Sequence, residues 1–182
     1  MNKKISLVGT PLAGASTFFA SLPRRLPELH LERRDSRDWR LDSPPGKDHI
    51  CFGHIRLGGS IFFSDLRTAA ESSSDTKDQV EFFRHSFRTL FVADSQIARF
   101  DANVWHWKWW REQQQQNDMA DVTASILFLN KQDLSKAVEV EKQVRYFEKL
   151  KDRPVEIHVG SAVTGEGVHE CVSRLLDISQ NG

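Results

Sequence analysis

Cysteine, net charge and long apolar runs are all scarce in this chain of 182 residues. The only cysteines are Cys51 and Cys171, and neither belongs to a C-x-x-C pair, so we expect no structural disulfide or zinc site and a reducing compartment. The 25 basic and 25 acidic side chains cancel, so the basic excess of a typical nucleic-acid-binding protein is missing. We therefore expect no nucleic-acid partner.

Membrane signals are also missing from the sequence. No apolar stretch approaches the roughly 20 residues that cross a bilayer. Met1–Lys4 is not followed by a signal-peptide core and lacks the glycine of a myristoylation site, while Gln180–Gly182 offers no cysteine for prenylation. These features predict a soluble, cytoplasmic protein with no membrane anchor.

Short apolar runs alternate with amphipathic segments along the whole chain. The runs that predict strands are Ile5–Val8, Ile50–Leu57, Ile61–Phe63, Leu90–Ala93, Ile126–Leu129 and Val155–Val159. Helices are predicted over 16–22, where Pro23 ends the helix, over 96–116 and over 168–176. A further helix is predicted after Asp133, with Ala137, Val140, Val144 and Phe147 on one face. Residues 24–48 are polar and predict a long loop.

This order predicts an α/β fold in a single domain spanning residues 1–182. Alternating strands and helices favour a mostly parallel sheet of six strands, with helices on both faces and ligands at the carboxyl ends of the strands. Gly58-Gly59 lies between two strands and predicts a hairpin, so one strand should be antiparallel.

The loop after the first strand has the spacing of a phosphate-binding loop. Gly9-Thr10-Pro11-Leu12-Ala13-Gly14-Ala15-Ser16 fits G-x-x-x-x-G-K-S/T, with Ala15 in place of the lysine. In such a loop the backbone N–H groups and the helix N-terminus surround phosphates, and the hydroxyl of Ser16 could hold Mg²⁺. The candidate phosphate-binding residues are Gly9, Ala13, Gly14, Ala15, Ser16 and Thr17. The alternative is a tight strand-to-helix turn without a ligand.

Two further loops follow predicted strands. Asn130-Lys131-Gln132-Asp133 directly follows Ile126–Leu129, and Ser161-Ala162-Val163 follows the last strand. The alternative for the first loop is a helix N-cap at Asp133. In order and context the two loops resemble the N-K-x-D and S-A-x guanine-recognition loops of small GTPases, so the resemblance implies a small-GTPase-like P-loop fold.

The resemblance also implies a role for each loop residue. Asp133 would accept hydrogen bonds from the guanine ring N–H and amine, and Lys131 would lay its stem over the base. Asn130 would tie this loop to the phosphate loop. The Ala162 N–H would meet guanine O6, beside Val163, and Ser161 would order that turn. GTP or GDP with Mg²⁺ is thus the implied ligand.

A narrower resemblance rests on Phe91-Val92-Ala93-Asp94-Ser95-Gln96, followed by Arg99 and Asn103. This segment, together with Ile50–Gly53, is similar to bacterial gliding-motility (MglA-type) small GTPases, which are relatives of Arf and of the signal-recognition-particle receptor β-subunit. The resemblance covers nearly the whole chain and is sharpest over 5–17, 90–103, 126–134 and 157–168.

The departures from the family pattern concern hydrolysis. No threonine occurs between Thr17 and Thr68, where the family has a metal-sensing threonine near the place of His49. The D-x-x-G motif aligns with Asp65–Thr68, so threonine replaces the glycine, and Ala69 stands where a water-positioning glutamine is common. Since phosphoryl transfer depends on positioned cations and an oriented water, we expect little or no GTP hydrolysis and assign no catalytic residue.

A displaced cation is one possible compensation for Ala15. The candidates are Arg33, Arg34, Arg37, Arg40, Lys47 and Arg67. The alternative is a solvated loop, because acidic residues are interleaved with these cations.

One predicted helix is rich in tryptophan. Trp105, Trp107, Trp109 and Trp110 fall on two sides of it, so some indole surface is expected to be exposed to a protein partner. The alternative is that the indoles fill the core.

The prediction is therefore a degenerate MglA/Arf-like GTPase that keeps a guanine pocket, binds GTP or GDP weakly and serves as a regulatory or assembly module. A roadblock-type regulator is a partner by analogy. A nucleotide-free interaction scaffold is the first alternative. An active GTPase with a displaced cation and a trans-acting activator is the second.

Overall fold

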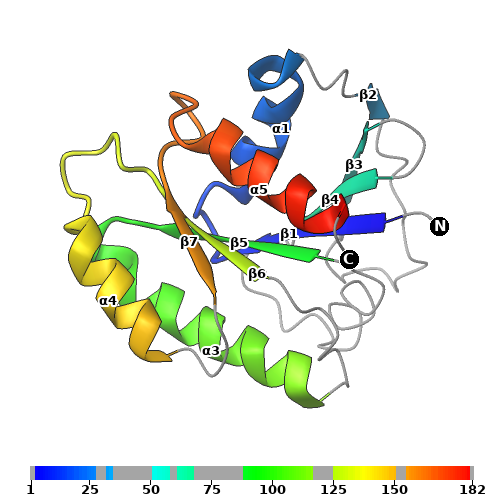
Figure 1. Ribbon diagram of the computed structural model, residues 1–182. Coiled ribbons are helices and arrows are strands. Elements are labelled where there is room, and N and C mark those ends of the chain that lie inside the picture. Colours follow the sequence, from blue (N-terminus) through cyan, green and yellow to red (C-terminus); the bar gives the residue numbers. More distant parts are fainter. Residues whose placement is uncertain are drawn as a thin grey trace, which may run out of the picture.

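A single sheet organises the protein, as a computed structural model shows (Figure 1). The structure describes residues 3–27, 32–34, 51–57, 61–67, 88–116, 125–150 and 155–180. Across the sheet, the strands within these ranges are β2 Glu32–Arg34, β3 Cys51–Leu57, β4 Ile61–Arg67, β1 Lys3–Gly9, β5 Arg88–Asp94, β6 Ser125–Asn130 and β7 Glu156–Val159.

Most neighbouring strands are parallel. β1 pairs in parallel with β4 and β5, and β6 does so with β5 and β7. β3 runs antiparallel to both of its neighbours, β2 and β4. The predicted α/β fold with a parallel sheet and helices is confirmed, but the predicted count of six strands is wrong. The described residues contain seven, because Glu32–Arg34, in the stretch predicted as a loop, pairs with β3.

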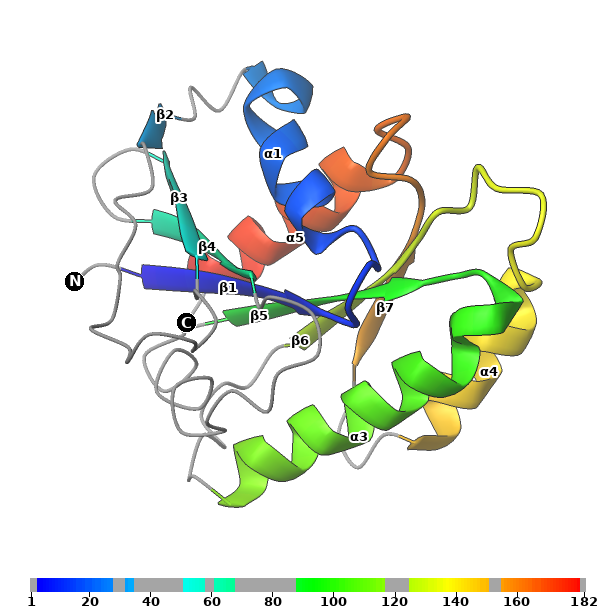
Figure 2. The ribbon, with the colours of Figure 1, turned by 180° about the vertical axis from the view of Figure 1, so that it is seen from behind.

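Helices cover both faces of the sheet (Figures 1 and 2). The helices α1 Ala15–Arg25 and α5 Val168–Gln180 lie on one face, and α3 Phe100–Gln116 and α4 Val140–Leu150 lie on the other. Because side chains alternate along a strand, Leu90 and Val92 of β5 pack toward α1 and α5, while Phe91 packs with α3 and α4. In the described part of the chain, no helix has the length and apolar content to cross a membrane.

Several helix limits differ from the sequence prediction: α3 begins at Phe100 and not at residue 96, and α5 continues to Gln180. The helix α1 continues through Pro23 to Arg25, because the proline removes only one N–H near the helix end and Leu26 N still donates to Leu22 O at 2.9 Å. The helix predicted directly after Asp133 begins only at Val140. The intervening residues form turns, in which Leu134 N donates to Lys131 O at 3.2 Å, so Asp133 is not a helix N-cap.

The tryptophan helix is mainly a core element, and of its four candidate partner-binding indoles two are buried. Trp107 and Trp110 are each 1% exposed, and the Trp107 ring meets Phe91 edge-on at 5.2 Å between ring centroids. Aromatic side chains of β5 and α4 face this side of α3, and burying the indoles against them excludes water. Trp109 is half-buried, and only Trp105 of the four is largely exposed, at 61%.

Candidate functional site

The phosphate-loop segment begins with a tight turn. Ala13 N donates to Thr10 O at 2.9 Å, Pro11 follows Thr10, and Leu12 has φ 67°. Proline at the second position and a positive φ at the third are the features of a type II turn. A residue with a side chain is disfavoured there, and its left-handed conformation costs about 1–2 kcal/mol.

Backbone strain coincides with the predicted loops. Among the described residues, Leu12 and Lys131 are the non-glycine residues with positive φ, 67° and 69° respectively. One belongs to the phosphate loop and the other to the N-K-x-D loop. Strained conformations of this kind persist where the surroundings enforce them, and they concentrate at functional sites.

The strained turn leads into an open helix N-terminus. Gly14, with φ 92°, precedes the first residue of α1, Ala15, and no side chain caps the helix. Left-handed residues alternating with right-handed ones turn successive N–H groups toward one concave side, which suits an anion. The N–H groups of Ala15, Ser16 and Thr17 lie in the first helical turn, where no intrahelical acceptor exists. The backbone here therefore has the arrangement of N–H groups that the predicted phosphate loop requires.

Asn130 joins three loops. This residue ends β6 and is 2% exposed. Its Nδ2 donates to Ala13 O at 2.8 Å, and its Oδ1 accepts from Ala162 N at 2.8 Å. Loops that follow β1, β6 and β7 thus meet at one side-chain amide, at the carboxyl edge of the sheet where ligands bind in α/β folds.

The contact between the first two loops requires glycine at position 14. A Cβ on Gly14 would lie 2.5 Å from Asn130 Nδ2 and 4.0 Å from Lys131 Cε. A larger residue would push the loops apart and would also be strained at φ 92°.

A partly buried ion pair lies beside this junction. Lys131 Nζ contacts Asp94 Oδ2 at 2.7 Å, and the Asp94 side chain is only 1% exposed. Gln96 N donates to Asp94 Oδ1 at 3.0 Å, and the Gln96 side chain donates to both carboxylate oxygens at 3.2 Å. The charge of Lys131 is thus already neutralised by the protein, and its stem extends past Gly14.

Other predicted site groups remain available. Asp133 is exposed, and within the described residues its carboxylate has no hydrogen-bond or ion-pair partner. The same holds for the hydroxyl of half-buried Ser16. By contrast, the Ala162 N–H that the sequence assigned to a guanine oxygen donates to Asn130 instead.

The third loop is ordered from two sides. Buried Ser161 accepts a hydrogen bond at Oγ from Thr164 N at 3.2 Å, and Gly165 N donates to Ser161 O at 2.8 Å. Arg25, at the end of α1, donates to the carbonyl of exposed Val163, and a Cβ on Gly165 would lie 2.8 Å from Arg25 Cζ. Arg25 therefore fixes this loop to α1.

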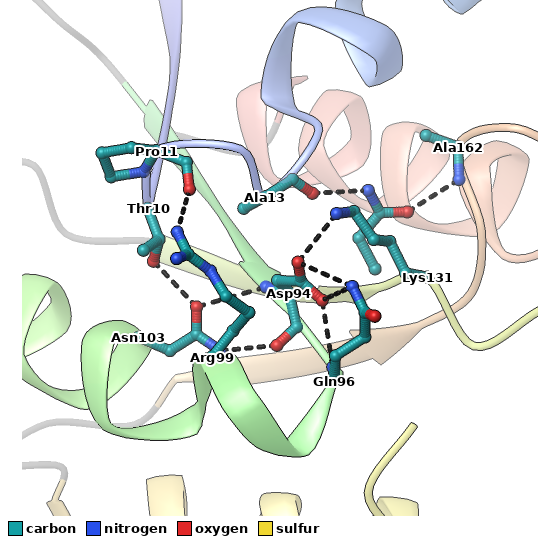
Figure 3. Close-up of polar contacts among 10 residues, drawn as sticks. Thr10, Pro11, Ala13, Asp94, Gln96, Arg99, Asn103, Lys131 and Ala162 are labelled. Carbon is teal, nitrogen blue, oxygen red and sulfur yellow. Dashed lines mark hydrogen bonds and ion pairs between the residues drawn. The ribbon is translucent and has the colours of Figure 1, made fainter. Parts of the chain in front are cut away.

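Two residues near the start of α3 hold the phosphate loop from outside (Figure 3). Thr10 Oγ1 donates to Asn103 Oδ1 at 2.8 Å, and Asn103 Nδ2 donates to Asp94 O at 2.6 Å. Arg99, which ends the short helix η2 Ile97–Arg99, donates through Nη2 to Pro11 O. In the part of the chain that the structure describes, no carboxylate pairs with Arg99.

Arg99 also acts on His106. Burial, and second the nearby Arg99 charge, hold the pKa of His106 below its ordinary value of 6.5. At a pH between the lowered pKa of the folded chain and 6.5, His106 binds a proton in the unfolded chain and not in the folded chain. This histidine therefore makes folding less favourable as pH falls through 6.5.

Replacing Arg99 by glutamine should raise the pKa of His106 toward 6.5 without reaching it, since burial is the larger cause. The shift of the His106 ring proton signal followed against pH by NMR measures this. A pKa that stays at its wild-type value would show that the Arg99 charge is not felt there.

The structure thus brings most predicted site residues together, with two additions. Gly9 ends β1, Ala13 to Thr17 form the loop and first turn, and Asn130, Lys131 and Ala162 surround them. Sequence reasoning missed the contacts of Arg25 and Arg99, which span 138 and 88 residues. Arg99 was part of the motif that follows Asp94, but no spacing rule predicts the contact of Arg99 with Pro11.

Fewer groups come together at the predicted metal site than in the predicted nucleotide loops. The described residues contain no cluster of three or more His, Cys, Asp or Glu side chains that could hold an ion. Ser16 supplies one hydroxyl, and Asp65 lies opposite Leu7 in the register of β4 and β1. The predicted cations Arg33, Arg34 and Arg67 lie on strands β2 and β4, and Arg37, Arg40, Lys47, His49, Thr68 and Ala69 lie outside the described residues.

The protein has an α/β fold in which three loops meet at the carboxyl edge of the sheet. A family model of the ADP-ribosylation factor (Arf) family matches residues 82–179, more than half of the chain. The protein belongs to the Arf family, within the Ras/Arf-like small GTPases. The matched region contains Asn130–Asp133 and Ser161–Val163, whereas the phosphate loop precedes it. No curated protein matches the chain significantly.

Proposed function

We propose that this protein is a degenerate MglA/Arf-like small GTPase that binds GTP or GDP weakly and hydrolyses little or none of it. One observation carries the proposal: the Asn130 side chain joins the phosphate loop, through Ala13, to the Ala162 loop. A base-reading loop and a phosphate-binding turn held this close can contact the two ends of one nucleotide.

The base end supports guanine as the ligand. Asp133 presents an exposed carboxylate without a partner in the described residues, and a carboxylate can accept two hydrogen bonds from the ring N–H and amine of guanine. Adenine offers no such pair of donors. The Lys131 stem is fixed by Asp94 beside the same loop, where it can cover a base plane. Selectivity for guanine would come from Asp133.

The phosphate end supports weak binding. The N–H groups between Leu12 and Thr17, apart from the bonded N–H of Ala13, can hold phosphates together with the helix dipole. Ser16 would be the protein's ligand to Mg²⁺. Ala15 occupies the position of the lysine that would neutralise the phosphates. Loss of one charged contact, ~1.5–3 kcal/mol, weakens binding by roughly 10- to 150-fold.

A second candidate function, a scaffold that binds no nucleotide, has its own support. Ala13 N, Ala162 N and Lys131 Nζ, three donors that could meet a nucleotide, are already bonded within the protein. Exposed Trp105 would then be the main functional feature, as a contact for a protein partner such as a roadblock-type regulator. In either case the protein would act as a regulatory or assembly module.

Titration with fluorescent GDP and GTP in the presence of Mg²⁺ tests the proposal. We expect saturable binding that is competed by unlabelled GDP and not by ADP, with no phosphate release over hours. No binding up to millimolar nucleotide supports the scaffold instead. Phosphate release that begins when a partner is added supports a trans-activated GTPase.

Restoring the missing lysine should tighten binding without restoring turnover. Ala15→Lys places a cation in the first turn of α1, so GDP and GTP affinity should rise about tenfold. Hydrolysis should stay absent, because Thr68 and Ala69 are unchanged. The matched control is Ala20→Lys, which adds the same charge at an exposed position of α1. Equal GDP affinity in A15K and wild type would show that phosphates do not bind at this helix.

A further inference from the structure

Arg99 contacts the peptide that precedes Leu12, a residue with positive φ in the phosphate loop. Its Nη2 donates to the carbonyl oxygen of Pro11, the central peptide of the Thr10–Ala13 turn (Figure 3). The next residue, Leu12, has φ 67° and an exposed side chain, at 78%. No packing of the Leu12 side chain therefore accounts for its conformation.

The turn has a second conformation that suits its sequence better. With proline second and leucine third, a type I turn needs no positive φ and keeps the Thr10 O to Ala13 N hydrogen bond. The two turns differ by a flip of the Pro11–Leu12 peptide. In the type I form the Pro11 carbonyl would no longer point at Arg99, so the Arg99 hydrogen bond favours the strained form.

The orientation of the Pro11–Leu12 peptide determines whether its N–H group points toward a ligand in the loop. The C=O and N–H of a trans peptide point in opposite directions, so a carbonyl held by Arg99 turns the Leu12 N–H to the other side. That N–H begins the nest, which continues with the N–H groups of Gly14 and Ala15, while Ala13 N donates to Thr10 O within the turn.

We propose that Arg99 is a positioning residue that holds the Pro11–Leu12 peptide in the orientation that completes the phosphate nest. The inference rests on the proposed function, since the nest is taken to bind the phosphates of a guanine nucleotide. Arg99 has no carboxylate partner in the described residues, so the full charge-assisted strength of its hydrogen bond falls on Pro11. Arg99 thereby offsets part of the phosphate affinity that the loop lacks because Ala15 replaces a lysine.

A double-mutant cycle tests the positioning role. Arg99→Gln should weaken GDP binding about tenfold, as expected for the loss of one charged hydrogen bond. Leu12→Gly removes the penalty on positive φ, so in the L12G background Arg99→Gln should have almost no effect on GDP affinity. The control Lys108→Gln removes the same charge from an exposed position on α3 and should bind GDP as the wild type does.

The conformation of the Thr10–Ala13 turn can be measured by NMR without nucleotide. In the strained turn the Pro11 Hα lies close to the Leu12 N–H, and in the type I turn the two are well separated. A strong nuclear Overhauser effect between them should be present in wild type and L12G, lost in R99Q and restored in R99Q/L12G. Arg99→Lys, which keeps one cationic donor, should fall between wild type and R99Q in both readouts.

The outcomes separate the inference from the proposed function. If wild type binds no GDP, the proposed function fails, and the Overhauser effect alone decides whether Arg99 sets the peptide. An unchanged Overhauser effect in R99Q overturns the inference. A tenfold loss of GDP affinity that persists in the L12G background also overturns it, because Arg99 would then act through its charge and not through the turn.

Discussion

Asn130→Ala is expected to destabilise the folded protein by about 2–4 kcal/mol and to abolish measurable nucleotide binding. The substitution leaves Ala13 O and Ala162 N, both in buried hydrogen bonds with Asn130, without a partner. An unsatisfied buried polar group costs more than the net gain of the bond it made. Urea denaturation measures the free energy of unfolding, and thermal unfolding should shift by roughly 5–15 °C.

The neighbouring amide provides the control for N130A. Gln132→Ala removes bonds from Gln132 Nε2 to Ser95 Oγ at 2.6 Å and to Leu129 O at 3.4 Å, but neither reaches the phosphate loop. It should cost less than about 1 kcal/mol and leave nucleotide binding intact. If N130A unfolds within about 0.5 kcal/mol of wild type, the three loops are not held together by this side chain.

Asp133→Asn should lower GDP and GTP affinity by roughly 10- to 150-fold while leaving stability unchanged. The carboxylate is exposed and without a partner among the described residues, so its loss removes no contact that holds the fold. The amide that replaces it can accept only through one oxygen and presents an NH₂ group toward the guanine amine. Isothermal titration with GDP measures the first effect and urea denaturation the second.

The chemistry of the base supplies an internal control for D133N. Xanthine carries a carbonyl where guanine carries the amine, so the asparagine NH₂ can donate to it, and D133N should bind xanthosine diphosphate better than wild type does. Glu139→Gln, which removes the same charge from an exposed position in the same connection, should leave GDP affinity unchanged. Equal GDP affinity in D133N and wild type would remove Asp133 from the base site.

The sheet could be predicted because its strands carry strong signals. Ile126–Leu129 and Leu90–Ala93 are apolar on both faces, as buried parallel strands must be, and β5 and β6 lie there. β2 could not be predicted, since Glu32–Arg34 is charged and short, and pairing with β3 determines it. The helix after Asp133 was placed too early because Ala137 continues the apolar spacing of α4 into a turn.

The site was predictable where it depends on local sequence and not where it depends on contacts between distant residues. The positions of Asn130 and Gly14 follow from motif spacing, and the structure joins them directly. The direction of Trp107 and Trp110 could not be decided from helical periodicity, because two faces of α3 carry indoles and the sheet determines which is buried. Arg99 and Arg25 reach carbonyl oxygens of distant loops, and no pattern in their own segments encodes that.

Ala15 and Leu12 bear on the phosphate loop in opposite ways. Ala15 stands where a lysine would neutralise phosphates, whereas Leu12 has the positive φ that an anion-binding nest requires. Pro11-Leu12 also suits a type I turn, so the observed turn costs about 1–2 kcal/mol, and the hydrogen bond from Arg99 to the Pro11 carbonyl favours it.

The most direct test of a guanine-nucleotide site is to denature freshly purified protein and identify by chromatography what it releases. Purification in buffer that contains Mg²⁺ and GDP throughout keeps even a weak site occupied, provided that the free nucleotide of a protein-free filtrate is subtracted and not removed; N130A serves as the blank. We expect wild type to release GDP or GTP, no adenine nucleotide to appear, and N130A to release nothing. Wild-type protein that releases no guanine nucleotide, and no more than N130A does, would contradict a guanine-nucleotide site.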